Sequence, residues 1–233
     1  MKKKMSIKII SLFPQFLEQY LSFGIVARAV AKKILKFKFV NLRDFGLDLR
    51  GTVDDRPYGG GLGMVLRPDV LHKAITFAKK KELRKKKKVI LLTPQGKVLT
   101  QKIAQELTKQ DELIFVCGRY EGFDERIRKF VNMELSIGDY VLMGGELAAL
   151  VATETVIRLI PGVLGKDDSS LAESHSAGML EYPQYTKPEI WEVSKKKIRV
   201  PKVLLTGNHA KINAWRESEA LKRTKKRRPD LIK

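Results

Sequence analysis

The sequence predicts an α/β protein built on a mostly parallel sheet, and three observations support this class. Short apolar runs, typical of buried strands, alternate with segments whose apolar residues recur at helical spacing. Glycine-marked turns follow several of these runs, as expected where parallel strands end. The chain has 233 residues, 43% of them apolar, which is enough for one or two domains with a real core. Such alternation is the pattern of a parallel sheet covered by helices.

The individual elements follow from their apolar periodicity. The predicted strands are Ile7–Leu12, Phe37–Leu42, Val89–Thr93 and Leu113–Cys117. The predicted helices are Gln15–Ala31, Pro68–Lys81, Thr100–Thr108, Asp124–Phe130 and Glu146–Leu159. Thr100 is a residue type that caps helices, and the strand that begins at Val89 is expected to end at Pro94-Gln95-Gly96. The helix that begins at Glu146 is apolar on most faces, which predicts that it is buried.

The amino-acid composition of the chain changes after residue 164, which predicts a second domain. Gly165–Gly178 is polar, rich in small residues and without a periodic apolar face, so it is predicted to be a flexible interdomain loop. Residues 179–233 carry 15 Lys and Arg against 6 Asp and Glu, a net charge of +9, with a helical stretch near Ala210–Arg223. The predicted division is therefore 1–164, 165–178 and 179–233.

The whole chain is strongly basic, which predicts a polyanionic partner. Lys and Arg number 46 and Asp and Glu number 26, giving a net charge of +20 and an isoelectric point near 10.0. Phosphate contacts made by such side chains release counterions and favour association with nucleic acid. Part of the charge lies in the runs Lys79–Lys88 and Lys222–Arg228. A charge run is also compatible with a solvated face, and charge alone does not indicate which nucleic acid is bound.

Other compositional features narrow the class of protein. The single cysteine, Cys117, excludes an internal disulfide and a metal site built from cysteines. The histidines His72, His175 and His209 are not spaced as metal ligands, so no bound structural metal is expected. The apolar runs are far shorter than the roughly 20 residues that span a bilayer. The basic N-terminus leads into a strand rather than a signal peptide, and a cytoplasmic location without membrane attachment is expected.

Three glycine-marked turns lie close together in the sequence and predict a single pocket. They are Gly118–Gly122, Ser136–Leu142 and Gly144–Glu146. Glycine lets the backbone turn at positive φ or approach a ligand closely, so a pocket built largely of main chain is expected. The absence of a GxGxxG motif between a strand and a helix argues against a dinucleotide site of the Rossmann type.

Several longer motifs carry a resemblance to a known family. The blocks DDRPYGGGLGM, GRYEG, SIGDYVL, GGE, RxIPGVLG and YPQYTKP occur in order between Ile9 and Pro229. Together they are similar to the bacterial tRNA (guanine-37-N1)-methyltransferases of the SPOUT superfamily. The resemblance implies a sheet with a deep trefoil knot, a small mostly helical C-terminal domain, and a homodimer with the active site at the subunit interface. It further implies methylation of N1 of guanosine 37 in tRNA by S-adenosylmethionine, with magnesium accompanying the tRNA.

The resemblance also assigns binding residues. It implies that the cofactor contacts Gln95, Gly96, Gly118, Tyr120, Glu121, Ile137, Gly138, Asp139, Tyr140, Val141, Leu142, Gly144 and Gly145. It implies that tRNA contacts Asp54, Arg56, Tyr58 and Gly59 near the guanine, and Lys211, Arg216, Lys222 and Arg223 in the basic C-terminal domain. The four basic residues would meet phosphates, which position an RNA without reading its sequence.

The catalytic pair implied by the resemblance contains one departure from the family pattern. Methylation at N1 needs a base for the N1 proton and a cation for the charge that develops on O6. The family's arginine falls on Arg158, and its aspartate falls on Glu173, in AES where better-known members have EDS. Asp167 and Asp168 are alternative bases if the loop register differs. A solvated acid at Glu173, and a structural ion pair between Arg158 and Glu154, are the alternatives without catalysis.

Two other functions remain open at this stage. One is a SPOUT methyltransferase with a different RNA target, which the YPQYTKP and GNHAKINAWR blocks disfavour. The other is a basic RNA-binding protein that has lost catalysis, with the change to Glu173 as its sign. Intact GRYEG and SIGDYVL blocks and Arg158 argue against the second, because a decayed site would not be expected to keep them.

Overall fold

The computed structural model describes residues 4–79, 86–164, 178–194 and 196–232. The chain divides into two compact units, Met1–Asp167 and Asp168–Lys233, and each is described separately below. The predictions for Glu173, Asp167, Asp168 and His175, and nearly all of the predicted loop, lie outside the described residues. Among the helices that the structure describes, none is both long enough and apolar enough to cross a membrane.

Unit 1 is organised around a five-stranded sheet in which every pairing is parallel. The strand order is β2-β1-β6-β5-β7. The strands are β1 (Met5–Ser11), β2 (Leu35–Asn41), β5 (Lys87–Val98), β6 (Glu112–Cys117) and β7 (Met133–Ser136). Every residue of the central strand β6 is buried, which explains its continuous apolar run, because helices cover both faces of a parallel sheet. The predicted α/β class is confirmed.

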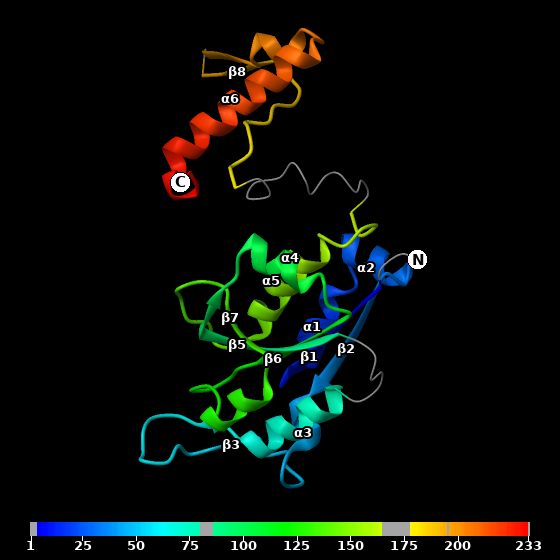
Figure 1. Ribbon diagram of the computed structural model, residues 1–233, viewed down its shortest axis with the longest axis vertical. Coiled ribbons are helices and arrows are strands. Elements are labelled where there is room, and N and C mark those ends of the chain that lie inside the picture. The colour runs from blue at the N-terminus through cyan, green and yellow to red at the C-terminus, as the bar shows by residue number, and fades with distance from the viewer. Residues whose placement is uncertain (1–3, 80–85, 165–177, 195, 233) are drawn as a thin grey trace. The chain divides into compact units, whose positions relative to one another are not determined.

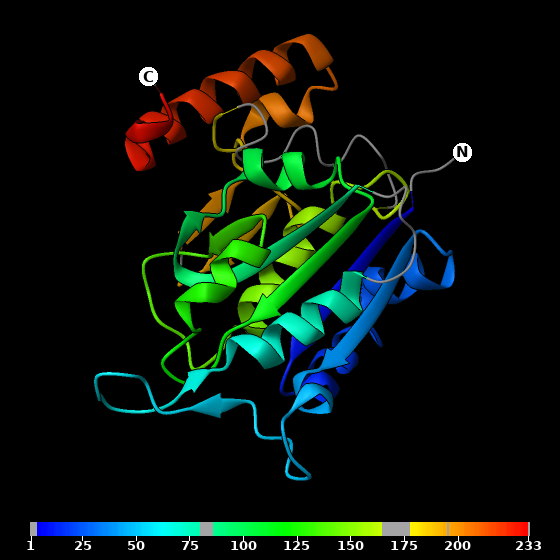
Figure 2. The same ribbon diagram turned by 60° about the horizontal axis from the view of Figure 1, so that its bottom comes forward.

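Helices cover the two faces of this sheet unequally (Figures 1 and 2). One face holds α3 (Pro68–Lys79) with the short helices η1 (Leu42–Phe45) and η2 (Glu125–Phe130). The other face holds α1 (Pro14–Tyr20), α2 (Gly24–Ala31), α4 (Gln101–Leu107) and α5 (Glu146–Ile157). Two separate apolar clusters result, one on each side of the sheet.

Local sequence signals account for the helices that were predicted correctly. The apolar stripe of α3 is entirely buried, namely Val70, Leu71, Ala74, Ile75 and Ala78. The hydroxyl of Thr100 accepts a hydrogen bond of 3.3 Å from the amide of Ile103, which confirms the predicted cap of α4. Asp124 caps η2 in the same way, through the amide of Arg126 at 3.0 Å.

The predicted single helix Gln15–Ala31 is wrong, because the structure has two helices there. The first ends at Tyr20, and the second begins at Gly24, whose φ of +62° lies in the left-handed region. Glycine adopts this conformation without the steric cost that other residues incur. The continuous apolar stripe concealed the break, because both helices bury apolar residues against the same face of the sheet.

The predicted end of the third strand at Thr93 is also wrong. β5 continues to Val98, and its pairing with β7 shifts register between Leu92 and Lys97, so that both residues oppose Leu135. The Pro94-Gln95-Gly96 segment is therefore an irregularity inside a strand rather than its end. The short strand β7 was not predicted at all.

The prediction that α5 is buried holds for only part of its surface. Ala149, Ala152 and Val156 are buried, but Leu147 is 52% exposed and Val151 is 46% exposed. The helix thus presents apolar side chains both to the core and to the outside of the described chain.

Unit 2 consists of a hairpin and a long helix. The hairpin pairs β8 (Ile190–Val193) with β9 (Lys196–Arg199), and it was not predicted. The short helices η4 (Lys202–Leu205) and η5 (Pro229–Leu231) flank α6 (His209–Arg227), which contains the predicted helical stretch. The buried hydroxyl of Thr224 on α6 accepts a hydrogen bond of 3.0 Å from the amide of Leu180.

Candidate functional site

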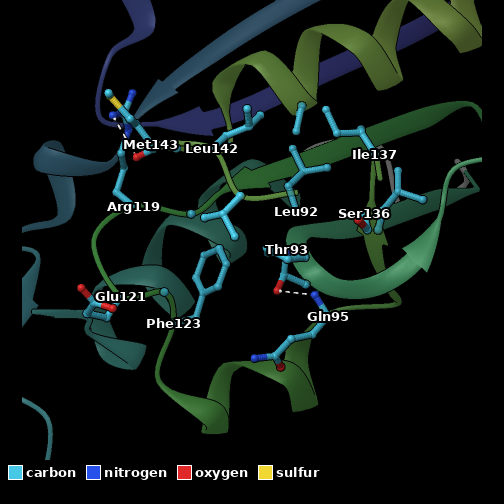
Figure 3. Close-up of a pocket in the computed structure, with 18 of the residues that line it drawn as sticks. Leu92, Thr93, Gln95, Arg119, Glu121, Phe123, Ser136, Ile137, Leu142 and Met143 are labelled. Atoms are coloured by element: carbon cyan, nitrogen blue, oxygen red, sulfur yellow. Dashed lines mark hydrogen bonds between the residues drawn. The ribbon is translucent and has the colours of Figure 1, made fainter. Parts of the chain in front are cut away.

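A pocket of about 350 Å³ lies at the carboxyl ends of β6 and β7, beside the irregular segment inside β5 (Figure 3). This edge is where open parallel sheets place their ligands. The three glycine-marked turns come together around it, joined by the irregular segment of β5, as the glycine pattern predicts. The lining includes Thr93, Gln95, Gly118, Arg119, Tyr120, Glu121, Phe123, Arg128, Ser136, Ile137, Gly138, Tyr140, Val141, Leu142, Met143, Gly144, Gly145 and Ala148.

The first turn follows β6 and is in direct contact with the third. The amide of Gly145 donates a hydrogen bond of 2.8 Å to the carbonyl of Gly118. A side chain on Gly145 would place its Cβ 2.8 Å from the Cα of Cys117 and from the amide nitrogen of Gly118. Glycine is therefore required at Gly145 by the close approach of two backbone segments.

The second turn follows β7 and is closed by its own side chains. The hydroxyl of Ser136 donates to the carbonyl of Gly138 at 2.9 Å and lies 3.2 Å from the amide of the same glycine. Gly138 has a φ of +152°, and the ring of Tyr140 occupies the space where its side chain would be. The Tyr140 hydroxyl in turn donates to the carbonyl of Ile137 at 3.2 Å.

The third turn is held by an ion pair between a buried carboxylate and a half-buried arginine. Arg119, from the first turn, pairs with Glu146 at 2.8 Å and donates to the carbonyl of Met143 at 3.3 Å. The other carboxylate oxygen of Glu146 accepts a hydrogen bond of 2.7 Å from Ser11, at the end of β1. The guanidinium of Arg119 also stacks 4.5 Å from the ring centre of Phe13. None of these four side chains was predicted as a site residue.

A second arginine supports the irregular segment of β5. Arg128, on η2, donates to the side-chain oxygen of Gln95 at 2.6 Å. It also pairs with Glu125 at 2.7 Å and with Glu134 on β7. The side-chain oxygen of Gln95 is thereby bonded to Arg128. The side-chain NH₂ group of Gln95 is then the part that can donate hydrogen bonds to a ligand. Arg128 was likewise not predicted.

Most of the cofactor-binding residues implied by the resemblance line this pocket. Two of them, Gly96 and Asp139, do not. Gly96 packs against the backbone of Leu135, where a Cβ would lie 2.5 Å from the carbonyl carbon of Glu134. Its glycine is thus explained by contact between β5 and β7 rather than by contact with a ligand.

The residues predicted to meet the guanine lie on a neighbouring loop. Asp54 belongs to the short strand β3 (Asp54–Asp55), which pairs with β4 (Val65–Leu66). The loop between them, residues 56–64, extends away from the sheet and leaves Tyr58 98% exposed (Figure 2). Arg56 and Gly59 belong to this loop, and Gly59 has a φ of +82°.

This loop is tied to the first turn of the pocket by backbone hydrogen bonds. The amide of Glu121 donates to the carbonyl of Met64 at 3.0 Å, and the amide of Leu66 donates to the carbonyl of Gly122 at 2.9 Å. The side chain of Glu121 lies against Gly63, within 2.6 Å of the position of a Cβ there. A movement of the loop would therefore also displace Glu121 and Gly122, which line the pocket.

The predicted phosphate-binding residues all lie on α6 in unit 2. Lys211 and Lys222 are exposed, and Lys222 pairs with Glu219 at 2.9 Å. The guanidinium of Arg216 lies 4.9 Å from the ring centre of Tyr182, which orients it. Arg223 is half-buried on the same helix.

Arg158 lies at the opposite end of α5 from the pocket. It follows the last residue of that helix and does not line the pocket. At 1.5 Å per residue, Arg158 is about 15 Å along the helix axis from Ala148, the pocket residue on α5. Glu154, considered as its structural partner, accepts a hydrogen bond of 3.3 Å from the hydroxyl of Tyr20.

Cys117, the last residue of β6, does not line the pocket and is not a candidate nucleophile. Burial raises the pKa of the Cys117 thiol well above its usual value, and the nearby charge of Glu146 raises it further. The thiol is therefore protonated and is a poor nucleophile. Among the described residues, no group of three or more His, Cys, Asp or Glu side chains is arranged to hold a metal ion.

The fold and the pocket together define a class of protein. It is a parallel α/β protein whose ligand pocket is built from the main-chain turns that follow β6 and β7, the turn before α5 and the irregular segment of β5, without a dinucleotide-binding motif. Comparison with known proteins identifies the family. Residues 5–233 match the family model described as tRNA (Guanine-1)-methyltransferase TrmD, and the chain belongs to this family. The family inferred from the motifs is confirmed.

Individual relatives agree with the family match. The chain is 50% identical over 229 residues to the tRNA (guanine-N(1)-)-methyltransferase of Brevibacillus brevis, covering 98% of this chain and 91% of the relative. It is 49% identical over 226 residues to the protein of the same name from Dictyoglomus turgidum, covering 97% and 89%. It is 46% identical over 230 residues to that of Bacillus subtilis, covering 98% and 93%.

Proposed function

We propose that the protein transfers a methyl group from S-adenosylmethionine to N1 of guanosine 37 in tRNA, next to the anticodon. The observation that carries this function is the convergence of three family motifs on one pocket, in a chain that belongs to the TrmD family along nearly its whole length. The basic C-terminal unit and the net charge of +20 support tRNA as the substrate.

The size and the lining of the pocket support S-adenosylmethionine as the cofactor. Its volume of about 350 Å³ falls within the range typical of small-molecule sites. Ile137, Leu142 and Phe123 give apolar walls for an adenine, and the surrounding turns give main-chain donors and acceptors. The carboxylate of Glu121 supplies a negative charge for a cationic ligand. The bound cofactor would supply the methyl group.

Two side chains are proposed to act on the guanine. Arg158 would stabilise the charge that develops on O6, and Glu173 would accept the N1 proton, with Asp167 or Asp168 as the alternative base. A glutamate in place of the family's aspartate keeps the carboxylate and adds one methylene. Magnesium bound with the tRNA is a further prediction.

A homodimer is proposed, with the active site at the subunit interface. Leu147 and Val151 leave one face of α5 apolar and half-exposed, and Phe13 and Phe16 are also exposed, at 44% and 47%. Exposed apolar groups of this kind mark association surfaces. The separation of about 15 Å between Arg158 and Ala148 along α5 favours a site that combines the pocket of one copy with Arg158 of a second.

The remaining features are proposed from family membership. They include the deep trefoil knot of the SPOUT superfamily and the division into a methyltransferase domain (1–164), an interdomain loop (165–178) and a tRNA-binding domain (179–233). The last is supported by the exposed basic residues on α6. A cytoplasmic location is expected for an enzyme that modifies tRNA.

The direct test is methyl transfer from labelled S-adenosylmethionine to an unmodified tRNA transcript with guanosine at position 37. The matched substrate has adenosine at that position, and the matched variant is Glu173→Gln. Transfer that requires guanosine 37 and is lost in the variant is the expected result. Transfer that survives in the variant would move the base to Asp167 or Asp168.

The remaining outcomes would change the function itself. Transfer to both transcripts would indicate a different RNA target. Cofactor binding without any transfer by the parent protein would contradict the enzyme and leave an RNA-binding protein.

A further inference from the structure

Glu146 is a buried acid at the first position of α5, and its carboxylate joins three separate parts of unit 1. Its side chain is 3% exposed. One oxygen accepts a hydrogen bond of 2.7 Å from Ser11, and the other lies 2.8 Å from a terminal nitrogen of Arg119. Burying a carboxylate is costly unless it is paired and hydrogen-bonded, so a residue of this kind calls for an explanation.

The partners of Glu146 belong to the segments that shape the pocket. Arg119 is in the first turn, Glu146 is the last residue of the third turn, and Ser11 ends the strand next to β6. Arg119 also donates to the carbonyl of Met143, the residue before Gly144. The third turn is therefore held at both of its ends by the same arginine.

Gly144 and Gly145 lie between the two contacts of Arg119, and neither has space for a side chain. A side chain on Gly144 would coincide with the guanidinium of Arg119, and one on Gly145 would meet the backbone of the first turn. The ring of Phe13 stacks on the guanidinium. The negative charge of Glu146 at the N-terminus of α5 is also favoured by the helix dipole. Its position at the start of the helix and its pairing therefore both hold Glu146 in place.

We propose that Glu146 is a positioning residue for the cofactor pocket. Through Arg119 it holds the third turn against the first, and through Ser11 it fixes both turns to the sheet. It does not line the pocket, so its effect on a ligand is indirect. This inference rests on the proposed function, because it takes the pocket to be the S-adenosylmethionine site.

The experiment compares Glu146→Gln with a control that is equally buried but distant from the pocket. Glu112, at the amino-terminal end of β6, has a side chain 4% exposed and pairs with Lys8 at 3.0 Å. Glu112→Gln thus removes a buried charge from the other end of the same sheet. Binding of S-adenosylhomocysteine is measured by titration calorimetry at a temperature where both variants are folded, and KM is measured for the cofactor and for tRNA.

The expected result separates positioning from stability. Both variants lose thermal stability, but only Glu146→Gln raises the Kd for S-adenosylhomocysteine and the cofactor KM by about tenfold or more, with the KM for tRNA little changed. Ser11→Ala, which removes the hydrogen bond to Glu146 and the one from the amide of Phe13 but no charge, raises the same Kd by a smaller factor. It also provides the test if Glu146→Gln does not fold.

The contrary outcomes are distinct. If the parent protein binds S-adenosylhomocysteine and Glu146→Gln or Ser11→Ala binds it equally well, the positioning role is wrong and the proposed function stands. An equal loss of binding in Glu112→Gln would also overturn the inference, because the effect would then be general destabilisation. If the parent protein does not bind the ligand, the proposed cofactor site fails and the inference fails with it.

Discussion

The amide of Gly145 donates a hydrogen bond of 2.8 Å to the carbonyl of Gly118, so that the first and third turns share one backbone contact at the pocket. Both glycines line the pocket, and the approach leaves no space for a side chain on Gly145. The pocket is therefore defined by contact between backbones, and side chains that are added there should open it.

Gly145→Ala is expected to weaken cofactor binding by at least tenfold, which corresponds to about 1.4 kcal/mol. Its Cβ would press against Cys117 and Gly118 at 2.8 Å and separate the two turns. Titration calorimetry with S-adenosylhomocysteine is the measurement. Gly207→Ala in unit 2 is the control, because Gly207 has a φ of +69° but open space around it. Equal affinities for the two variants would contradict the prediction.

Replacing Leu147 with glutamate is expected to shift the protein from dimer to monomer. The substitution places a charge on the exposed apolar face of α5, where a second copy is proposed to pack. Sedimentation velocity across a range of concentrations is the measurement. Phe77→Glu, at a 42% exposed residue of α3 on the opposite face of the sheet, is the control and is expected to remain dimeric. A dimeric Leu147→Glu protein would exclude this face as the interface.

Mixed dimers test whether Arg158 acts across the interface. Gly145→Ala and Arg158→Ala are each expected to abolish most methyl transfer as homodimers. A mixed dimer of the two variants has one site with an intact pocket and an intact arginine if these groups come from different copies. It should then recover up to about half of the activity per dimer. If no activity returns when the variants are co-expressed and purified with two tags, Arg158 acts within its own chain.

Neutralising Lys211 and Lys222 on α6 is expected to lower the salt dependence of tRNA binding. Removing one lysine–phosphate interaction reduces the slope of log K against log salt concentration by about 1. The slope is measured by filter binding between low and moderate salt concentration. Neutralising Lys36 and Lys38 on β2 gives a charge-matched control. A slope that is unchanged in the α6 variant would mean that these lysines face solvent in the complex.

Asp124 is expected to stabilise the protein at neutral pH but not in acid. Hydrogen bonds from Arg126, first from its side chain and then from its amide, outweigh burial and lower the pKa of the Asp124 carboxyl. A lowered folded-state pKa contributes stability above the unfolded value of about 3.9, and that contribution is lost as the pH falls through the folded-state pKa.

Asp124→Ala should therefore cost about 1 kcal/mol of unfolding free energy at pH 7, the usual value of a helix cap. The difference in unfolding free energy between Asp124→Ala and the parent protein should become smaller as the pH falls below about 4. Urea denaturation at several pH values is the measurement, with Glu106→Ala on the exposed side of α4 as the control. A difference that is constant with pH would show that the cap acts without its charge.

The sequence was most informative where local rules coincide with the tertiary structure. The apolar stripe of α3, the Thr100 cap and the buried run of β6 could all be predicted, because each depends on residues a few positions apart. The glycine pattern likewise indicated which turns would meet. Periodicity did not show the break at Gly24, because two helices on the same face of a sheet continue one stripe.

What could not be predicted depends on contacts between distant residues. The pairing of Arg119 with Glu146, and of Glu146 with Ser11, joins positions that no local pattern connects. A cation between two glycines and an acid at a helix start were the signals available, and each has an ordinary explanation alone. The support of Gln95 by Arg128 depends in the same way on η2 packing beside β5.

The hydrogen bond between Ser11 and Glu146 also bears on how the protein is made. During synthesis the chain emerges from its N-terminus, so Ser11 leaves the ribosome long before its partner. The pocket is completed only after residue 148 has emerged, because Ala148 is part of its lining. Contacts between distant residues of this kind slow folding and leave apolar strands exposed in the meantime. A nascent chain that ends before α5 should therefore be unable to bind the cofactor and should depend on chaperones to remain competent for folding.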